Sequence, residues 1–105
     1  MHSPLRLKKN NNLVQILKKR IPEIDNVAEM LGFFSTEELI EEALKESNIR
    51  SLEEAEQQVL RYILTSMGYD YIETISEMKE KLRATLAMLE KISLTIVKHR
   101  KSEEL

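Results

Sequence analysis

The last third of the sequence predicts one uninterrupted amphipathic helix, over about residues 71–102, which a compact domain of this size cannot enclose. About 32 residues at ~1.5 Å per residue make a helix ~48 Å long. A compact chain of 105 residues has a radius of gyration of ~13 Å, and so a diameter of roughly 30–35 Å. We therefore expect the helix to project beyond its own domain and to present an apolar stripe to a partner.

The composition favours one small all-α domain. Hydrophobic residues make up 42% of the chain, which is enough for a core, whereas two Gly and two Pro are too few for the turns of an all-β fold. The absence of Cys excludes disulfides and thiolate chemistry and is compatible with a cytoplasmic location. No run of ~18 apolar residues is present, so we expect no membrane span.

Helix signals predict four short helices before the long one, in a single domain over residues 12–105. Ser35 and Ser51 are each followed three residues later by a glutamate, which is the capping-box pattern of a helix start. Gly32 and Gly68 each follow an apolar helical stripe and predict a helix end. The predicted fold is therefore four short helices packed on one long C-terminal helix, a bundle that dimerisation completes.

Three further expectations concern the segments between these signals. Residues 1–11 are basic and predict a flexible arm. Asp70 is followed by Glu73, which predicts the start of the long helix. Phe33 and Phe34, the only two Phe of the chain, are expected to fill the core between helices.

The predicted long helix has an apolar heptad pattern. Ile75, Leu82 and Leu89 lie seven residues apart, and Met78 and Ile92 occupy the alternate position of the same heptads. Half of that alternate column is polar, so a helix pair or bundle fits better than a strict coiled coil. We predict self-association through this stripe, called the seam below. The seam consists of Ile75, Met78, Leu82, Leu86, Leu89, Ile92 and Ile96.

A charge-free stretch over residues 84–89 interrupts the charged faces of this helix. Ala84, Ala87 and Met88 point away from the seam, and small residues allow a second helix to approach closely. We interpret these three residues as a crossing point that another chain covers. Burial by the short helices of the same chain and simple solvent exposure are the alternatives, since Ala is also a good helix former.

The net charge of −2 conceals an uneven distribution: residues 1–20 contain no acid, and residues 21–60 contain eleven. The basic residues near the start could neutralise phosphates in nucleic acid, in a sequence-tolerant and salt-dependent manner. The alternative is that these Lys and Arg residues only keep the protein soluble, as basic residues near chain ends commonly do. The candidate nucleic-acid contacts are Arg6, Lys8, Lys9, Lys18, Lys19 and Arg20.

Residues 27–39 resemble a helix-turn-helix, with Ala28 and Gly32 four residues apart and a short turn before the next expected helix. The expected recognition helix carries five glutamates and one lysine, and DNA phosphates would repel it. We therefore do not expect this helix to read a groove. Its acidic face is a possible dock for a basic protein partner.

The glutamates at positions 37, 38 and 41 resemble the EExxE motif of all-α nucleotide pyrophosphohydrolases of the MazG type. That resemblance implies a Mg²⁺ site completed by a downstream ExxD motif. Here Glu53 and Glu56 stand at the downstream position and the aspartate is missing, so we expect no metal, cofactor or catalysis. The sequence thus favours a non-catalytic interaction or assembly protein, with a nucleic-acid-binding regulator and a MazG-like enzyme as alternatives.

Overall fold

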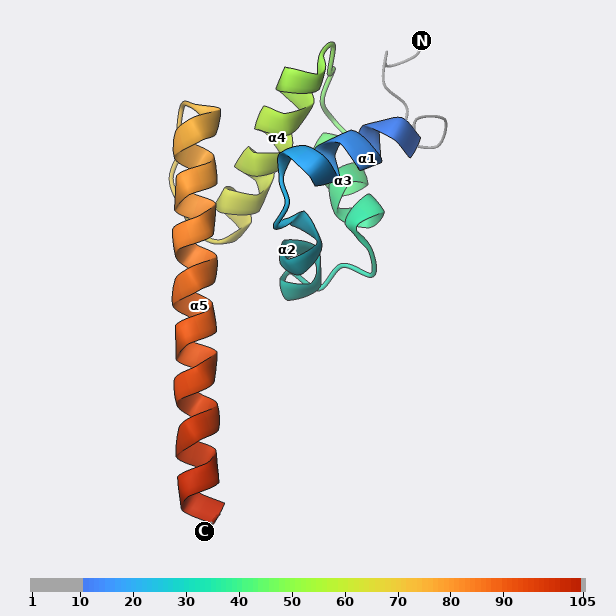
Figure 1. Ribbon diagram of the computed structural model, residues 1–105. Helices are drawn as coiled ribbons and strands as arrows, with labels where there is room; N and C mark the ends of the chain where they lie inside the picture. Colours follow the sequence, from blue (N-terminus) through green and yellow to red (C-terminus); the bar gives the residue numbers. More distant parts are fainter. Residues whose placement is uncertain (1–10, 105) are drawn as a thin grey trace.

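The computed structural model describes residues 11–104, with side chains described for residues 12–92. Five helices and no strand make up this part of the chain, which confirms the all-α class (Figure 1). The helices are α1 (Asn11–Arg20), α2 (Ile24–Met30), α3 (Thr36–Leu44), α4 (Leu52–Ser66) and α5 (Ile75–Glu104).

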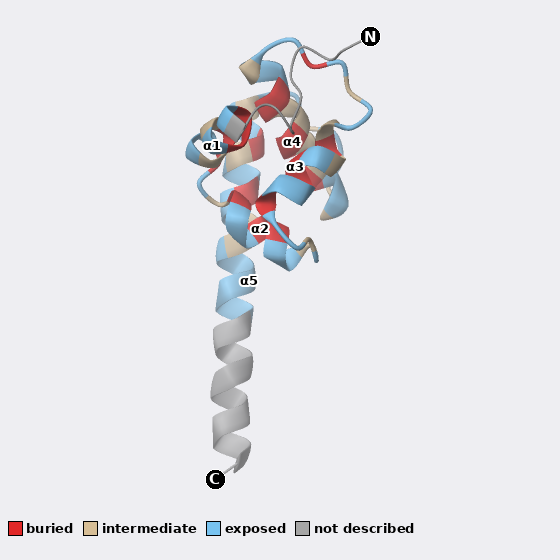
Figure 2. Cartoon of the chain, turned by 90° about the vertical axis from the view of Figure 1, so that its right-hand side faces the viewer, coloured by how far each residue is buried: buried red, intermediate tan, exposed pale blue. Residues whose placement is uncertain are grey.

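Helix α5 projects from a body formed by α1–α4, residues 11–66. Its 30 residues correspond to a length of ~45 Å, and the molecule measures 62 × 27 × 21 Å. Figure 1 shows the body gathered beside the first half of α5, with the second half extending past it. In Figure 2 the buried residues gather in the body, and α5 is exposed where it leaves the body. The radius of gyration, 16.1 Å, exceeds the ~13 Å of a compact chain of this length.

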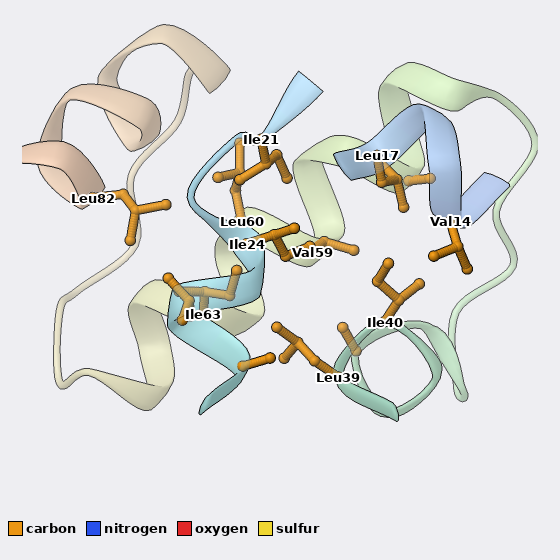
Figure 3. Packing of buried hydrophobic residues seen from close by; sticks show 14 of the residues in the cluster. Val14, Leu17, Ile21, Ile24, Leu39, Ile40, Val59, Leu60, Ile63 and Leu82 are labelled. Carbon is orange, nitrogen blue, oxygen red and sulfur yellow. The ribbon is translucent and has the colours of Figure 1, made fainter. Parts of the chain in front are cut away.

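The four short helices do not all pack on α5, which is a difference from the sequence prediction. Helix α5 packs chiefly on α4, whereas α1 and α2 pack on α3 and α1 also packs on α4. The short helices thus share a core of their own, and α4 joins that core to α5. Figure 3 shows the buried side chains meeting between the helices. The ten that it labels are Val14, Leu17, Ile21, Ile24, Leu39, Ile40, Val59, Leu60, Ile63 and Leu82.

The predicted capping boxes start α3 and α4. The Ser35 hydroxyl accepts a hydrogen bond from the Glu38 N–H, and the Ser51 hydroxyl accepts one from the Glu54 N–H, each over 3.1 Å. In return, the Glu38 carboxylate accepts a hydrogen bond from the Phe34 N–H, and the Glu54 carboxylate accepts one from the Arg50 N–H. These bonds satisfy N–H groups that the first turn of a helix leaves without partners.

The predicted glycine stops are confirmed at the ends of α2 and α4. Gly32 has φ 89° and Gly68 has φ 93°, in the left-handed region that disfavours side chains. Apart from the glycine and its two chain neighbours, no residue has an atom within 4 Å of where a Cβ would be at either position. The requirement for glycine is therefore conformational and does not come from crowding.

The start of α5 differs from the prediction: the helix begins at Ile75, and Asp70 does not cap it. Thr74 is the cap. Its hydroxyl accepts the Glu77 N–H over 3.2 Å and also lies 2.8 Å from the Glu77 carboxylate. The sequence contains two consecutive start signals, Asp70 with Glu73 and Thr74 with Glu77, and the later one forms the helix.

Tertiary contacts of α4 explain why the earlier signal is not used. The Arg61 guanidinium donates to the Ile72 carbonyl over 3.5 Å and lies 4.4 Å from the centre of the Tyr71 ring. These two contacts involve Tyr71 and Ile72, which would both be helical if α5 began at residue 71. The connection between α4 and α5 therefore stays non-helical up to Thr74.

The prediction for Phe34 is wrong, because its side chain is 98% exposed. Phe33 is half-buried against the core and lies 6.4 Å from the Tyr62 ring, centre to centre. The two residues stand in the turn between α2 and α3, where adjacent side chains point in different directions. Only one of them can reach the core.

We expect Thr74→Ala to lower the free energy of unfolding by about 1 kcal/mol, because the first turn of α5 loses its cap. Ser76→Ala is the matched control: Ser76 is exposed in the same turn, and its loss removes no capping bond. Urea denaturation followed by circular dichroism measures both variants. Equal stability of the two variants would show that Thr74 does not fix the start of α5.

Candidate self-association surface on α5

The structure divides the predicted seam into a covered half and an uncovered half. Met78 and Leu82 are each 1% exposed, because the body covers them. Leu89 is 39% exposed and Ile92 is 48% exposed. Ile75 and Leu86 are half-buried against the core, and the Ile96 side chain lies outside the described residues.

Both halves lie on one face of α5. Leu89 follows Leu82 by seven residues, and Ile92 follows Met78 by fourteen. At about 100° per residue, each heptad turns the helix by only ~20° from its starting direction. The uncovered residues therefore continue the face that packs on α4 beyond the point where the body ends.

Polar contacts fix the covered half against the body and against the connection that follows α4. Tyr69 lies in that connection: its hydroxyl is hydrogen-bonded to the Thr85 hydroxyl, and the Lys81 ammonium lies 5.2 Å from the centre of its ring. On the body itself, the Glu23 carboxylate at the start of α2 accepts from the Arg83 guanidinium over 3.4 Å. The face that α5 turns towards the body is therefore set by several independent contacts.

The predicted crossing point is solvent-exposed in this chain. Ala84, Ala87 and Met88 are all exposed, Met88 by 58%. Ala87 lies about 140° around the helix from Leu82, so it faces away from the body. Burial of these three residues by the chain's own short helices does not occur.

A buried carboxylate that the sequence analysis missed ties three helices together. Glu56 on α4 is 4% exposed. It forms ion pairs with Arg20 of α1 over 3.1 Å and with Lys79 of α5 over 2.7 Å. The sequence does contain a signal for the burial of Glu56, because Glu56 stands on the same helical stripe as the apolar Val59 and Ile63.

Part of the candidate nucleic-acid cluster is engaged within the protein. Arg20 pairs with Glu56, and the Lys18 ammonium lies 4.0 Å from the Asp25 carboxylate. Lys19 is exposed. Arg6, Lys8 and Lys9 lie outside the described residues, so the structure places only three of the six candidates.

The carboxylates of the MazG-like pattern do not converge in the structure. Glu37, Glu38 and Glu41 are exposed on α3, and Glu53 is exposed on α4, whereas Glu56 is buried in its two ion pairs. In the described part of the chain, no three His, Cys, Asp or Glu side chains are grouped closely enough to hold a metal ion.

Residues 27–39 do form two helices joined by a short turn, α2 and α3. The three glutamates 37, 38 and 41 are exposed on the second helix, which leaves the electrostatic objection to groove reading in place.

Within the described residues, no helix is long and apolar enough to cross a membrane.

Comparisons with protein-family models, curated proteins and solved structures give no match for this chain. The uncovered face of α5, with Leu89 and Ile92, is therefore interpreted from its own geometry. It is the continuation of a packed helix face, and it is apolar where the body no longer covers it.

We expect Glu56→Gln to lower the free energy of unfolding by about 2–4 kcal/mol, because Arg20 and Lys79 lose their shared, buried anion. Glu53→Gln is the matched control, since Glu53 is exposed on the same helix. Urea denaturation measures both. If the two variants were equally stable, Glu56 would not be the tie between α1, α4 and α5.

Proposed function

We propose that this protein is a non-catalytic helical assembly module that self-associates through the part of α5 that projects from the body. The observation that carries the proposal is the division of the seam. One continuous apolar face is buried at Met78 and Leu82 and uncovered at Leu89 and Ile92. An apolar stripe on a helix needs a partner surface, because its exposure to water is unfavourable.

The shape of the molecule supports this proposal over a monomeric role. A helix that projects from its domain loses the packing that normally stabilises helices in proteins. A second helix laid on the uncovered face restores that packing. The same contact would bury Leu89 and Ile92, which are large hydrophobic residues exposed in the single chain.

The alternatives have less support. A nucleic-acid-binding regulator would use the basic cluster of the first 20 residues. Arg20 of that cluster is already ion-paired with Glu56 inside the protein. A MazG-like enzyme would need carboxylates that converge, and those of α3 are exposed and apart from the buried Glu56. A basic protein partner on the acidic face of α3 is compatible with self-association through α5, because the two surfaces lie on different helices.

We expect Leu89→Glu to abolish self-association and leave the fold of the single chain intact. The new carboxylate would be buried without a partner in the assembly, whereas position 89 is already partly in water in the single chain. The wild-type mass should be at least twice the 12.3 kDa of one chain, and the variant mass should equal that of one chain. Light scattering gives the mass, and circular dichroism monitors the fold.

Ala87→Glu is the matched control, because it adds the same charge two residues away on another face of α5. It should retain the wild-type mass. Leu86→Glu, in contrast, should also lower folding stability, because Leu86 is half-buried against the core. A monomeric wild-type protein at micromolar concentration would overturn the proposal. Dissociation by Ala87→Glu alone would move the interface to the crossing point formed by Ala84, Ala87 and Met88.

A further inference from the structure

We propose that the exposed surface around Phe34 binds the basic N-terminal segment of the same chain, residues 5–9. This surface, called the α3 face below, lies on α3 and on the turn before it. It consists of Phe34, Glu37, Glu38 and Glu41, which are all exposed. The inference does not depend on the proposed self-association, because the two surfaces lie on different helices.

The backbone around Phe34 is fixed, so the exposure of its ring is a feature of the fold. Its N–H donates to the Glu38 carboxylate over 3.0 Å, and the neighbouring Ser35 caps α3. A hydrophobic residue just before a cap often packs on the fourth residue of the helix, which here is Leu39. The Leu39 side chain is fully buried in the core, however, and the Phe34 ring stays outside, 98% exposed.

The charge around Phe34 is uniformly negative. Residues 21–44, which include α2, the turn and α3, contain seven acids and no Lys, Arg or His. In the described part of the chain, the ion pairs of α2 and α3 involve Glu23, Asp25 and Glu42. They do not involve the three glutamates of the α3 face, whose charge is therefore open to another segment.

The α3 face combines an aromatic ring with a carboxylate held beside it. The hydrogen bond from the Phe34 N–H fixes the Glu38 carboxylate at this place. An Arg or Lys side chain can pair with a carboxylate and lie over an aromatic ring at the same time. The chain already contains such a stack, since the Arg61 guanidinium lies 4.4 Å from the centre of the Tyr71 ring. The α3 face thus fits a segment with both apolar and cationic side chains.

Residues 5–9 have this composition. Their sequence is Leu-Arg-Leu-Lys-Lys, and the first 20 residues contain no acid. The other basic run, residues 98–101, belongs to the part of α5 that extends past the body, away from α3 (Figure 1). Charge complementarity and position therefore both select the N-terminal segment.

The segment is close enough to bind within its own chain. It is joined to α1, which packs on α3, and Figure 1 shows the first turn of α1 and the start of α3 on the side of the body away from α5. Residues 5–10 span up to ~20 Å when extended, whereas the nine residues of α3 measure only ~13 Å. A short tether also gives an effective concentration of about 1 mM or more, so that a weak contact suffices.

Paramagnetic relaxation enhancement in the full chain tests the contact. The chain has no Cys, so Ser3→Cys places a single spin label beside the segment. We expect the amide signals of the α3 face to lose most of their intensity and those of Glu53 and Glu54 to keep theirs. The start of α4 is the matched control surface, because it has the same capping box and two glutamates but Arg50 in place of Phe34. Equal losses at both helix starts, or no loss at either, would overturn the proposal.

A substitution tests the aromatic anchor. Phe34→Ser should restore the signals of the α3 face without affecting the fold, because the ring makes almost no contact in the body. Tyr71→Ser is the matched control, since Tyr71 is an aromatic residue 70% exposed on another part of the surface, and it should leave the loss unchanged. Persistence of the full loss in Phe34→Ser would contradict the proposed contact.

Salt tests the electrostatic part of the contact. Raising the ionic strength from ~0.1 M to ~1 M shortens the Debye length from ~10 Å to ~3 Å. The signals of the α3 face should then recover most of their intensity. A loss that is the same at both ionic strengths would contradict the role of the three glutamates.

A mixed sample distinguishes the chain's own segment from that of a second copy. It combines spin-labelled protein with isotope-labelled protein that carries no spin label, so that only contacts between copies cause a loss of signal. We expect no loss at the α3 face in this sample. A loss there would assign the segment to another copy and overturn binding within one chain. The contact within one chain should also be independent of protein concentration, which separates this test from that of self-association through α5.

Discussion

The packing of α4 on the first half of α5 determines the rest of the arrangement. It buries Met78 and Leu82 and so selects which face of α5 turns towards the body. Because the same face continues to Leu89 and Ile92, this one contact also determines which residues remain uncovered. In the proposed self-association, a partner would approach along this face, and folding and assembly would be two uses of the same face of α5.

Polar contacts give this apolar packing its orientation. A helix face of Met and Leu residues can slide or rotate with little loss of burial, because dispersion and hydrophobic contacts are not directional. The ion pair of Lys79 with the buried Glu56 and the contact of Arg83 with Glu23 are directional. They hold α5 against two different helices of the body. Helix α5 therefore leaves the body in one fixed direction.

Local signals in the sequence sufficed for the helix class and for most helix ends. Ser35 and Ser51 start helices and Gly32 and Gly68 end them, because caps and left-handed stops depend on a few neighbouring residues. The start of α5 was misplaced because the choice between two start signals depends on Arg61, which is distant in sequence. The sequence could equally not predict which residues of the seam the body covers. Heptad spacing is the same whether a residue packs on its own chain or on another, and only the extent of the body separates Leu82 from Leu89.

The most direct test of the central claim is amide hydrogen exchange along α5 as a function of protein concentration. Amides at 78–86 should exchange slowly at every concentration, because the body covers that half of the helix. Amides at 89–92 should become protected as the concentration rises through the dissociation constant, over about a hundredfold range. If exchange at 89–92 were independent of concentration throughout that range, the uncovered face of α5 would not be an interface between copies.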